Sequence, residues 1–120
     1  MGYLVVPSGR LHLPQSDEAA AAAAAMTAMT GRSGWFDPGD PTASQTLTEL
    51  GRWVAASIER DGDWIEFGPE DLGDAKWSEQ AEAFYRALAP FVRSGTVHIE
   101  GEDGGQWSYT YADGQVTEAE

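Results

Sequence analysis

The chain has 120 residues, of which 42% are hydrophobic and 11% aromatic, and its formal net charge is −13. This length predicts one domain over residues 1–120 that buries roughly two-thirds of the surface of its unfolded chain. The chain has no cysteine, which excludes a disulfide framework, a thiolate metal site and a cysteine nucleophile. The negative charge disfavours direct binding to nucleic acid and to anionic membranes, because their phosphates would repel it.

The N-terminal segment 3–13 is apolar and partly β-branched, and Pro7, Ser8 and Gly9 interrupt it. Proline lacks the amide donor that a sheet ladder needs. We therefore expect either an edge strand with a bulge or two short strands.

An alanine run at 19–25 follows and predicts a helix near residues 17–30, because alanine is the best helix former. The alternative is a loosely packed alanine tract, since propensity alone does not decide between the two. Asp17 and Glu18 precede the run where a secretory signal would be basic, and the run is too short to span a membrane. A cytoplasmic protein is the expectation.

The middle of the chain predicts two further helices and a strand. Apolar residues at three- and four-residue spacing predict a helix near 43–60. Alternation over 63–67 predicts a short strand, and a second apolar stripe predicts a helix near 75–92 that Pro90 kinks or shortens. The two stripes consist of Leu47, Leu50, Val54 and Ile58, and of Trp77, Ala81, Phe84, Leu88 and Phe91.

The C-terminal segment 95–120 reads as a three-stranded antiparallel meander. Asp113-Gly114 predicts a two-residue type I′ turn, in which both residues have positive φ. The preceding turn is predicted to be a three-residue loop, 102–104, with its glycine in a left-handed conformation. That loop places Ile99 opposite Trp107, whereas a one-residue slip would point the apolar side chains at water.

These elements together predict an α+β fold. We expect an antiparallel sheet that includes the C-terminal three-stranded meander, with about three helices packed on one face of the sheet.

Both ends of the chain resemble uncharacterised small proteins of actinobacteria and their phages, a domain of unknown function. Those proteins also begin with Met-Gly-Tyr and end on a Gly-Glu-Asp turn, a tryptophan strand and an Asp-Gly hairpin. The resemblance implies a host range, and it implies no functional residues. The residues that carry it are Met1-Gly2-Tyr3, the segment 9–14, Gly101-Glu102-Asp103, Trp107-Ser108-Tyr109 and Asp113-Gly114-Gln115-Val116.

Motifs of catalysis and metal binding are missing from the sequence. The stretch from Asp61 begins like a calcium loop, but Glu66 stands where the loop needs glycine and Leu72 where it needs glutamate. The two histidines, His12 and His98, alternate with apolar residues and are expected on solvent-facing sides of strands. There is no nucleophile elbow, Walker loop or dinucleotide fingerprint. The expectation is a protein without catalytic residues, metal or cofactor.

Five tryptophans stand in the chain. Trp64, Trp77 and Trp107 follow core periodicity, so we assign them to the core. Trp35 and Phe36 lie in a loop without periodicity. They either fold back as a plug over the core or anchor a partner, because large aromatics dominate binding hot spots.

The strongest local concentration of charge lies between residues 59 and 74, where Arg60 is the opposing cation. The segment is either a solvated face that keeps the protein soluble or a negative surface that docks a basic partner. In one version of the second reading the carboxylates mimic nucleic-acid phosphates. The acidic residues are Glu59, Asp61, Asp63, Glu66, Glu70, Asp71 and Asp74.

Two functional hypotheses follow. The first is a small acidic interaction protein that binds a host or partner protein, for example as a phage inhibitor or nucleic-acid mimic. The alternative is a ligand- or carbohydrate-binding module that uses the Trp35 loop and the polar face of the sheet. Salt separates them, because binding through charge weakens as ionic strength rises.

Overall fold

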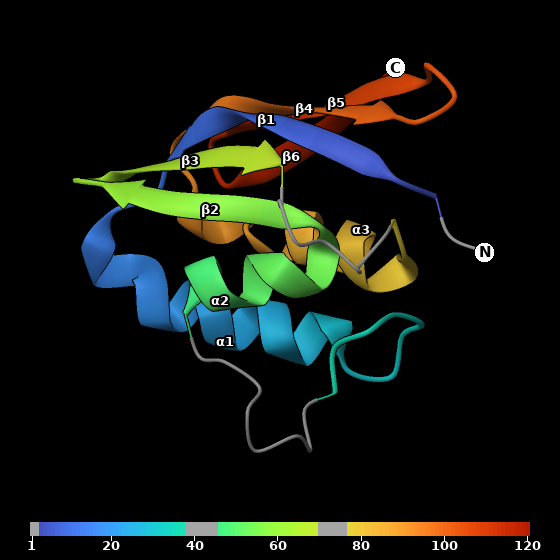
Figure 1. Cartoon of the computed structure of the whole chain (residues 1–120). Coiled ribbons are helices and arrows are strands. Elements are labelled where there is room, and N and C mark those ends of the chain that lie inside the picture. Colours follow the sequence, from blue (N-terminus) through green and yellow to red (C-terminus); the bar gives the residue numbers. More distant parts are fainter. Residues whose placement is uncertain (1–2, 38–45, 70–76) are drawn as a thin grey trace.

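Six strands form one antiparallel sheet, and the α-helices cover one of its faces (Figure 1). The computed structural model describes residues 3–37, 46–69 and 77–120. Within these ranges the predicted α+β class is confirmed, with the helices on one face. The elements are β1 (Val5–His12), η1 (Gln15–Asp17), α1 (Glu18–Met29), α2 (Leu47–Gly51), η2 (Arg52–Val54), β2 (Ala56–Asp61), β3 (Trp64–Pro69), α3 (Glu79–Ala87), η3 (Ala89–Phe91), β4 (Ser94–Gly101), β5 (Gln106–Ala112) and β6 (Gln115–Ala119).

The C-terminal strands β4, β5 and β6 form the predicted meander at one end of the sheet. Ile99 lies opposite Trp107, as the three-residue loop requires, and Gly104 in that loop has a φ of +86°. Asp113 and Gly114 have φ values of 54° and 76°, which are the positive angles of a type I′ turn. The register predicted from the sequence is confirmed.

The N-terminal strand β1 differs from its prediction. The strand order β2-β3-β1-β4-β5-β6 places it inside the sheet, and its register with β4 runs without a break from Val5 to His12. The prediction of an edge strand with a bulge, or of two short strands, is therefore wrong. Pro7 pairs with Ile99 of β4, and among the described residues the pairing of β1 with β3 begins only at Gly9. No described residue of β3 therefore needs the amide donor that Pro7 lacks.

The predicted helix near 43–60 is also wrong in its second half. Residues 43–45 lie outside the described ranges, and α2 with η2 ends at a left-handed Ala55, with φ 62°. The chain then continues as β2, where Ile58 pairs with Phe67 of β3. Ile58 reaches the same core from a strand, so the apolar spacing runs unchanged across the boundary between helix and strand.

Helix α1 confirms the predicted alanine helix. Its side chains Ala21, Ala22, Ala25 and Met29 are fully buried, and the helix packs against α3. The small alanine side chains let the two helices approach closely, so the loosely packed tract is ruled out. In the described part of the chain, no helix combines the length and the apolar character needed to cross a membrane.

Helix α3 is shorter than the predicted 75–92. It begins after Ser78, whose side-chain oxygen accepts a hydrogen bond from the amide of Ala81 at 3.2 Å. It gives way to the 3-10 turn η3, which contains Pro90. Proline therefore shortens the helix as predicted, because its ring cannot continue an α-helical turn.

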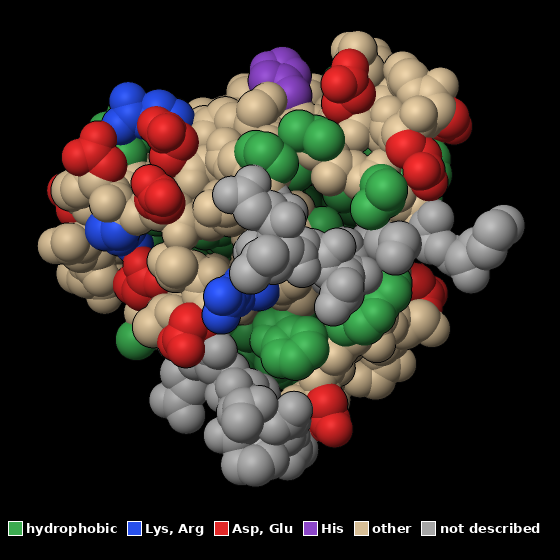
Figure 2. Space-filling view, viewed as in Figure 1, with side chains coloured by type: hydrophobic (Ala, Val, Ile, Leu, Met, Phe, Trp, Pro, Cys, Tyr) green, Lys and Arg blue, Asp and Glu red, His purple; other side chains and the backbone are tan. Residues whose placement is uncertain are grey.

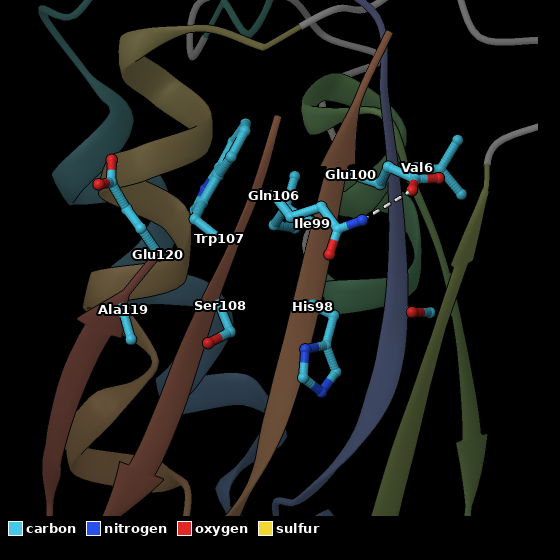
Figure 3. A pocket seen from close by; sticks show the side chains of 10 residues that line it. Val6, His98, Ile99, Glu100, Gln106, Trp107, Ser108, Ala119 and Glu120 are labelled. Atoms are coloured by element: carbon cyan, nitrogen blue, oxygen red, sulfur yellow. Dashed lines mark hydrogen bonds between the residues drawn. The ribbon is translucent and has the colours of Figure 1, made fainter. Parts of the chain in front are cut away.

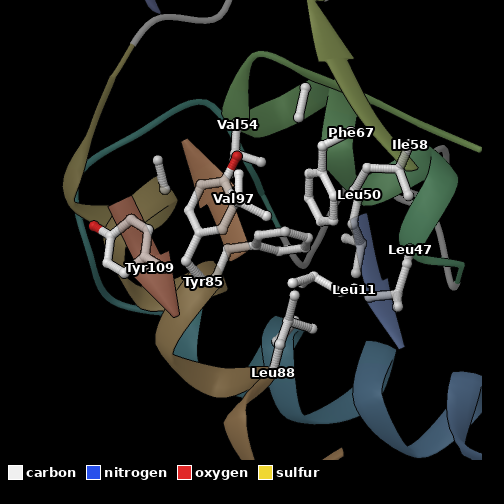
Figure 4. Close-up of a cluster of buried hydrophobic side chains, with 14 of the residues drawn as sticks. Leu11, Leu47, Leu50, Val54, Ile58, Phe67, Tyr85, Leu88, Val97 and Tyr109 are labelled. Atoms are coloured by element: carbon white, nitrogen blue, oxygen red, sulfur yellow. The ribbon is translucent and has the colours of Figure 1, made fainter. Parts of the chain in front are cut away.

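The core lies between the helices and the sheet and is rich in aromatic rings (Figure 4). The rings of Tyr85 in α3 and Tyr109 in β5 stack at 5.1 Å between centroids. Trp77 packs edge-on against Trp107 at 5.0 Å, and both are partly buried against the core, in agreement with their assignment. The aromatic face of the meander is thus covered by α3, and no element of the described residues covers the opposite face of the sheet.

Candidate interaction surface

The uncovered side of the sheet, here called the open face, is polar. Strand residues alternate between the two sides of a sheet, so those between the buried positions of each strand point away from the helices. Cross-strand polar contacts such as Thr96 to Thr110, at 3.1 Å between hydroxyl oxygens, run along it. The positions on this face include Val6, Ser8, Arg10, His12, Ser57, Glu59, Asp61, Trp64, Glu66, Thr96, His98, Glu100, Gln106, Ser108, Thr110 and Thr117.

Trp64 lies on the open face, and its assignment to the core is wrong. Its neighbours Ile65 and Phe67 are buried, and strict alternation then places Trp64 on the other side. Its ring stacks on the imidazole of His12 at 5.0 Å between centroids. The guanidinium of Arg10 lies 5.1 Å from the ring centroid, within reach of a cation–π interaction. A large aromatic is therefore held in place on a solvent-facing surface.

Three of the predicted acidic residues lie on the same face of the sheet as this aromatic. Asp61 and Glu66 both contact Arg10, at 3.3 Å and 3.6 Å between nitrogen and oxygen, and Glu59 lies directly opposite Glu66. Figure 2 shows acidic side chains gathered at two ends of the sheet, over the β2–β3 turn and over the β4–β5 loop, with basic side chains among the first group. The structure therefore brings Glu59, Asp61 and Glu66 onto the same face of the sheet as Trp64.

The cation that contacts Asp61 and Glu66 is Arg10, whereas Arg60, the cation within segment 59–74, contacts other groups. Arg60 lies on the helical side of β2, where its guanidinium contacts the carboxylate of Glu18 and the carbonyl oxygen of Leu13. Arg10 comes from β1, which is distant in sequence and adjacent in the sheet. Pairing between strands brings Arg10 into the acidic segment, and a local count of charges does not include it.

The other predicted acids do not extend this cluster. Asp63 lies in the β2–β3 turn, where its carboxylate accepts a hydrogen bond from the amide of Gln15 at 3.2 Å. Its contact ties the turn to the start of the helical layer. Glu70, Asp71 and Asp74 lie outside the described residues.

Trp35 and Phe36 have different environments. Phe36 is 4% exposed, and its ring packs edge-on against Trp53. Gln80 in α3, itself buried, bonds the backbone amide and the carbonyl of Phe36, both at 2.8 Å. Phe36 is therefore the plug, whereas Trp35 is 43% exposed. Their loop belongs to the helical layer, so the structure does not bring Trp35 to the open face.

His98 lies on the open face beside a hollow of about 470 Å³ (Figure 3). Glu100 and Gln106 stand at its edge, joined by a hydrogen bond of 3.1 Å from Nε2 to Oε2. The sequence predicted the solvent-facing position of His98 and gave no signal for the hollow. Among the described residues, no three His, Asp or Glu side chains gather as a metal site requires.

The titratable groups with shifted pKa values lie outside the open face. Burial raises the pKa of the tyrosines Tyr85, Tyr109 and Tyr111, which remain neutral phenols. A hydrogen bond from the backbone of Ser33 lowers the pKa of the Glu79 carboxyl. These groups contribute to the packing and hydrogen bonding of the fold, and none of them lies near Trp64 in the sheet.

Comparison of the chain with protein-family models, with curated proteins and with solved structures gave no match. The resemblance of the chain ends to small actinobacterial and phage proteins therefore remains a prediction.

Proposed function

We propose that this protein is a non-enzymatic interaction protein whose open face binds a basic protein partner, with Trp64 as the aromatic anchor. The single observation that carries the proposal is the Trp64 ring, which contacts both His12 and Arg10 on the polar open face. Tryptophan and arginine are the side chains most enriched in binding hot spots. A ring already fixed by its neighbours loses little conformational freedom on binding, which lowers the entropic cost of association.

The open face has the size of a protein interface. Six strands about 4.8 Å apart span about 24 Å, and strands of up to eight residues are about 26 Å long. Their product, roughly 600 Å², is of the same order as the ~800 Å² that each partner contributes to a standard interface.

Charge selects the kind of partner. The protein carries a net charge of −13, and the acids Glu59, Asp61, Glu66 and Glu100 stand on the open face. A basic surface would be drawn to this face and its association accelerated at low salt. If that basic surface is one that also binds nucleic acid, the protein would act as a competitor by mimicry. The alternative of a carbohydrate-binding module requires the Trp35 loop and the polar face of the sheet to form one site. Trp35 lies in the helical layer, away from that face.

The test is a titration of the isotope-labelled protein with a short arginine-rich peptide, followed by nuclear magnetic resonance. We expect the peptide to shift the Trp64 indole signal and the amide signals of β1 and β3. Replacing Trp64 by Ala should weaken binding by roughly tenfold or more, as loss of a hot-spot residue does, and leave the fold intact.

Two charge variants of equal size provide the matched control. The first changes Glu59→Gln, Asp61→Asn and Glu66→Gln on the open face; the second changes Asp17→Asn, Glu82→Gln and Asp113→Asn elsewhere. Only the first should weaken binding of the peptide. Equal weakening by both, or signals that move only in the helical layer, would refute the proposed face.

A further inference from the structure

The hollow beside His98 arises from small side chains in one row across the sheet. Ser8, His98, Ser108 and Ala119 lie side by side on four neighbouring strands. Two serines and an alanine fill little of the space above the backbone. The longer side chains of the neighbouring row, Glu100 among them, form one wall (Figure 3).

The polar side chains around the hollow can accept hydrogen bonds, and Val6, Ile99, Trp107 and Ala119 are its apolar members. The amide of Gln106 bonds Oε2 of Glu100, which orients the carboxylate. Ser8 and Ser108 add hydroxyl oxygens that accept as well as donate, and Glu120 lies next to Ala119 at the rim of the hollow. Such a set suits a cation with several N–H donors.

We propose that this hollow binds an arginine side chain of the basic partner, an inference that rests on the proposed function. A guanidinium presents five N–H donors in one plane and pairs well with an oriented carboxylate. A volume of about 470 Å³ holds the guanidinium together with the backbone that carries it. Ser8 is four residues from His12 along β1, so the partner presents this arginine about 13 Å from the group that contacts Trp64.

The two histidines make the test selective, because His98 lies at the hollow and His12 lies against Trp64. The probe is acetyl-arginine methylamide at neutral pH, with acetyl-citrulline methylamide as its uncharged counterpart of the same shape. We expect the arginine compound, and not the citrulline compound, to shift the ring signals of His98 in a saturable way. Glu100→Gln should weaken this binding by roughly tenfold, the value of a hydrogen bond to a charged group. Glu82→Gln, which removes a carboxylate of α3 on the helical side of the sheet, should leave it unchanged.

Each outcome decides the proposal. An unmoved His98 signal, or an equal shift with citrulline, would overturn it. A shift of His12 alone would overturn the hollow and leave binding at Trp64 standing. The arginine compound could shift the His98 signal while the arginine-rich peptide leaves the Trp64 signals unchanged. That result would support the hollow as a binding site and refute the wider interface.

Discussion

The separation of Phe36 from Trp35 leads to a quantitative prediction. Phe36 is 4% exposed and Trp35 is 43% exposed, although they are adjacent in the sequence. Replacing Phe36 by Ala leaves a cavity that its neighbours fill only in part, which costs about 3 to 5 kcal/mol of the free energy of unfolding. At Trp35 water fills the space, so the expected cost is at most about 1 kcal/mol.

These energies correspond to distinct melting temperatures. The entropy of unfolding of a chain of 120 residues is about 0.25 kcal/mol/K. A loss of 3 kcal/mol then lowers the melting temperature by about 12 °C, and a loss of 1 kcal/mol lowers it by about 4 °C. Gln80 bonds the backbone of Phe36 and not its ring, so these hydrogen bonds persist in Phe36→Ala and the loss reports on packing.

Thermal unfolding followed by circular dichroism measures both variants. Phe36→Ala should unfold well below the wild type and Trp35→Ala close to it. Equal losses for the two variants, or a larger loss for Trp35→Ala, would refute the assignment of Phe36 as the plug.

Two further predictions concern the turn between β4 and β5. Gly104 has a φ of +86°, so Gly104→Val should lower the free energy of unfolding by about 1 to 2 kcal/mol. The loss should exceed that of Gly105→Val when both are measured by chemical denaturation. The reverse order would contradict the predicted turn. The hydroxyl of Tyr3 donates to Asp103, which raises the pKa of Tyr3 from 10.0 and lowers the pKa of Asp103 from 3.8. The stability that Tyr3→Phe removes should therefore be greatest between these two values, and it should shrink as the pH falls below 3.8 or rises above 10.0; a loss independent of pH would contradict it.

Local signals in the sequence were sufficient to predict the meander, and they favoured the alanine helix. A type I′ turn needs positive φ at both central residues, and Asp113-Gly114 supplies them. Once that turn is placed, the alternation of Trp107, Tyr109 and Tyr111 assigns every residue of β5 to a face. Alanine propensity favoured the helix in the same way, but only its buried side chains and its packing against α3 ruled out a loosely packed tract.

The extent of the second helix was decided by tertiary structure. The spacing from Leu47 to Ile58 suits a helix throughout, yet residues after Ala55 pair with β3 and become β2. The hydrogen bonds of the β2–β3 ladder stabilise this segment as a strand. The spacing of the apolar residues gives no sign of that pairing. Pro7 likewise suggested an edge, and only the pairing with β3, which among the described residues begins at Gly9, shows why an inner strand accommodates it.

The candidate surface depended on tertiary structure most of all. The sequence showed Asp61 and Glu66 as part of an acidic segment, and alternation with Ile65 and Phe67 contained the signal that Trp64 points outward. It did not show that Arg10 and His12 contact that tryptophan, because β1 and β3 are separated by about fifty residues of chain and meet only through sheet pairing. Composition and periodicity describe one segment at a time. Which segments become neighbours, and which face the helices leave uncovered, is determined by the free energy of packing the whole chain.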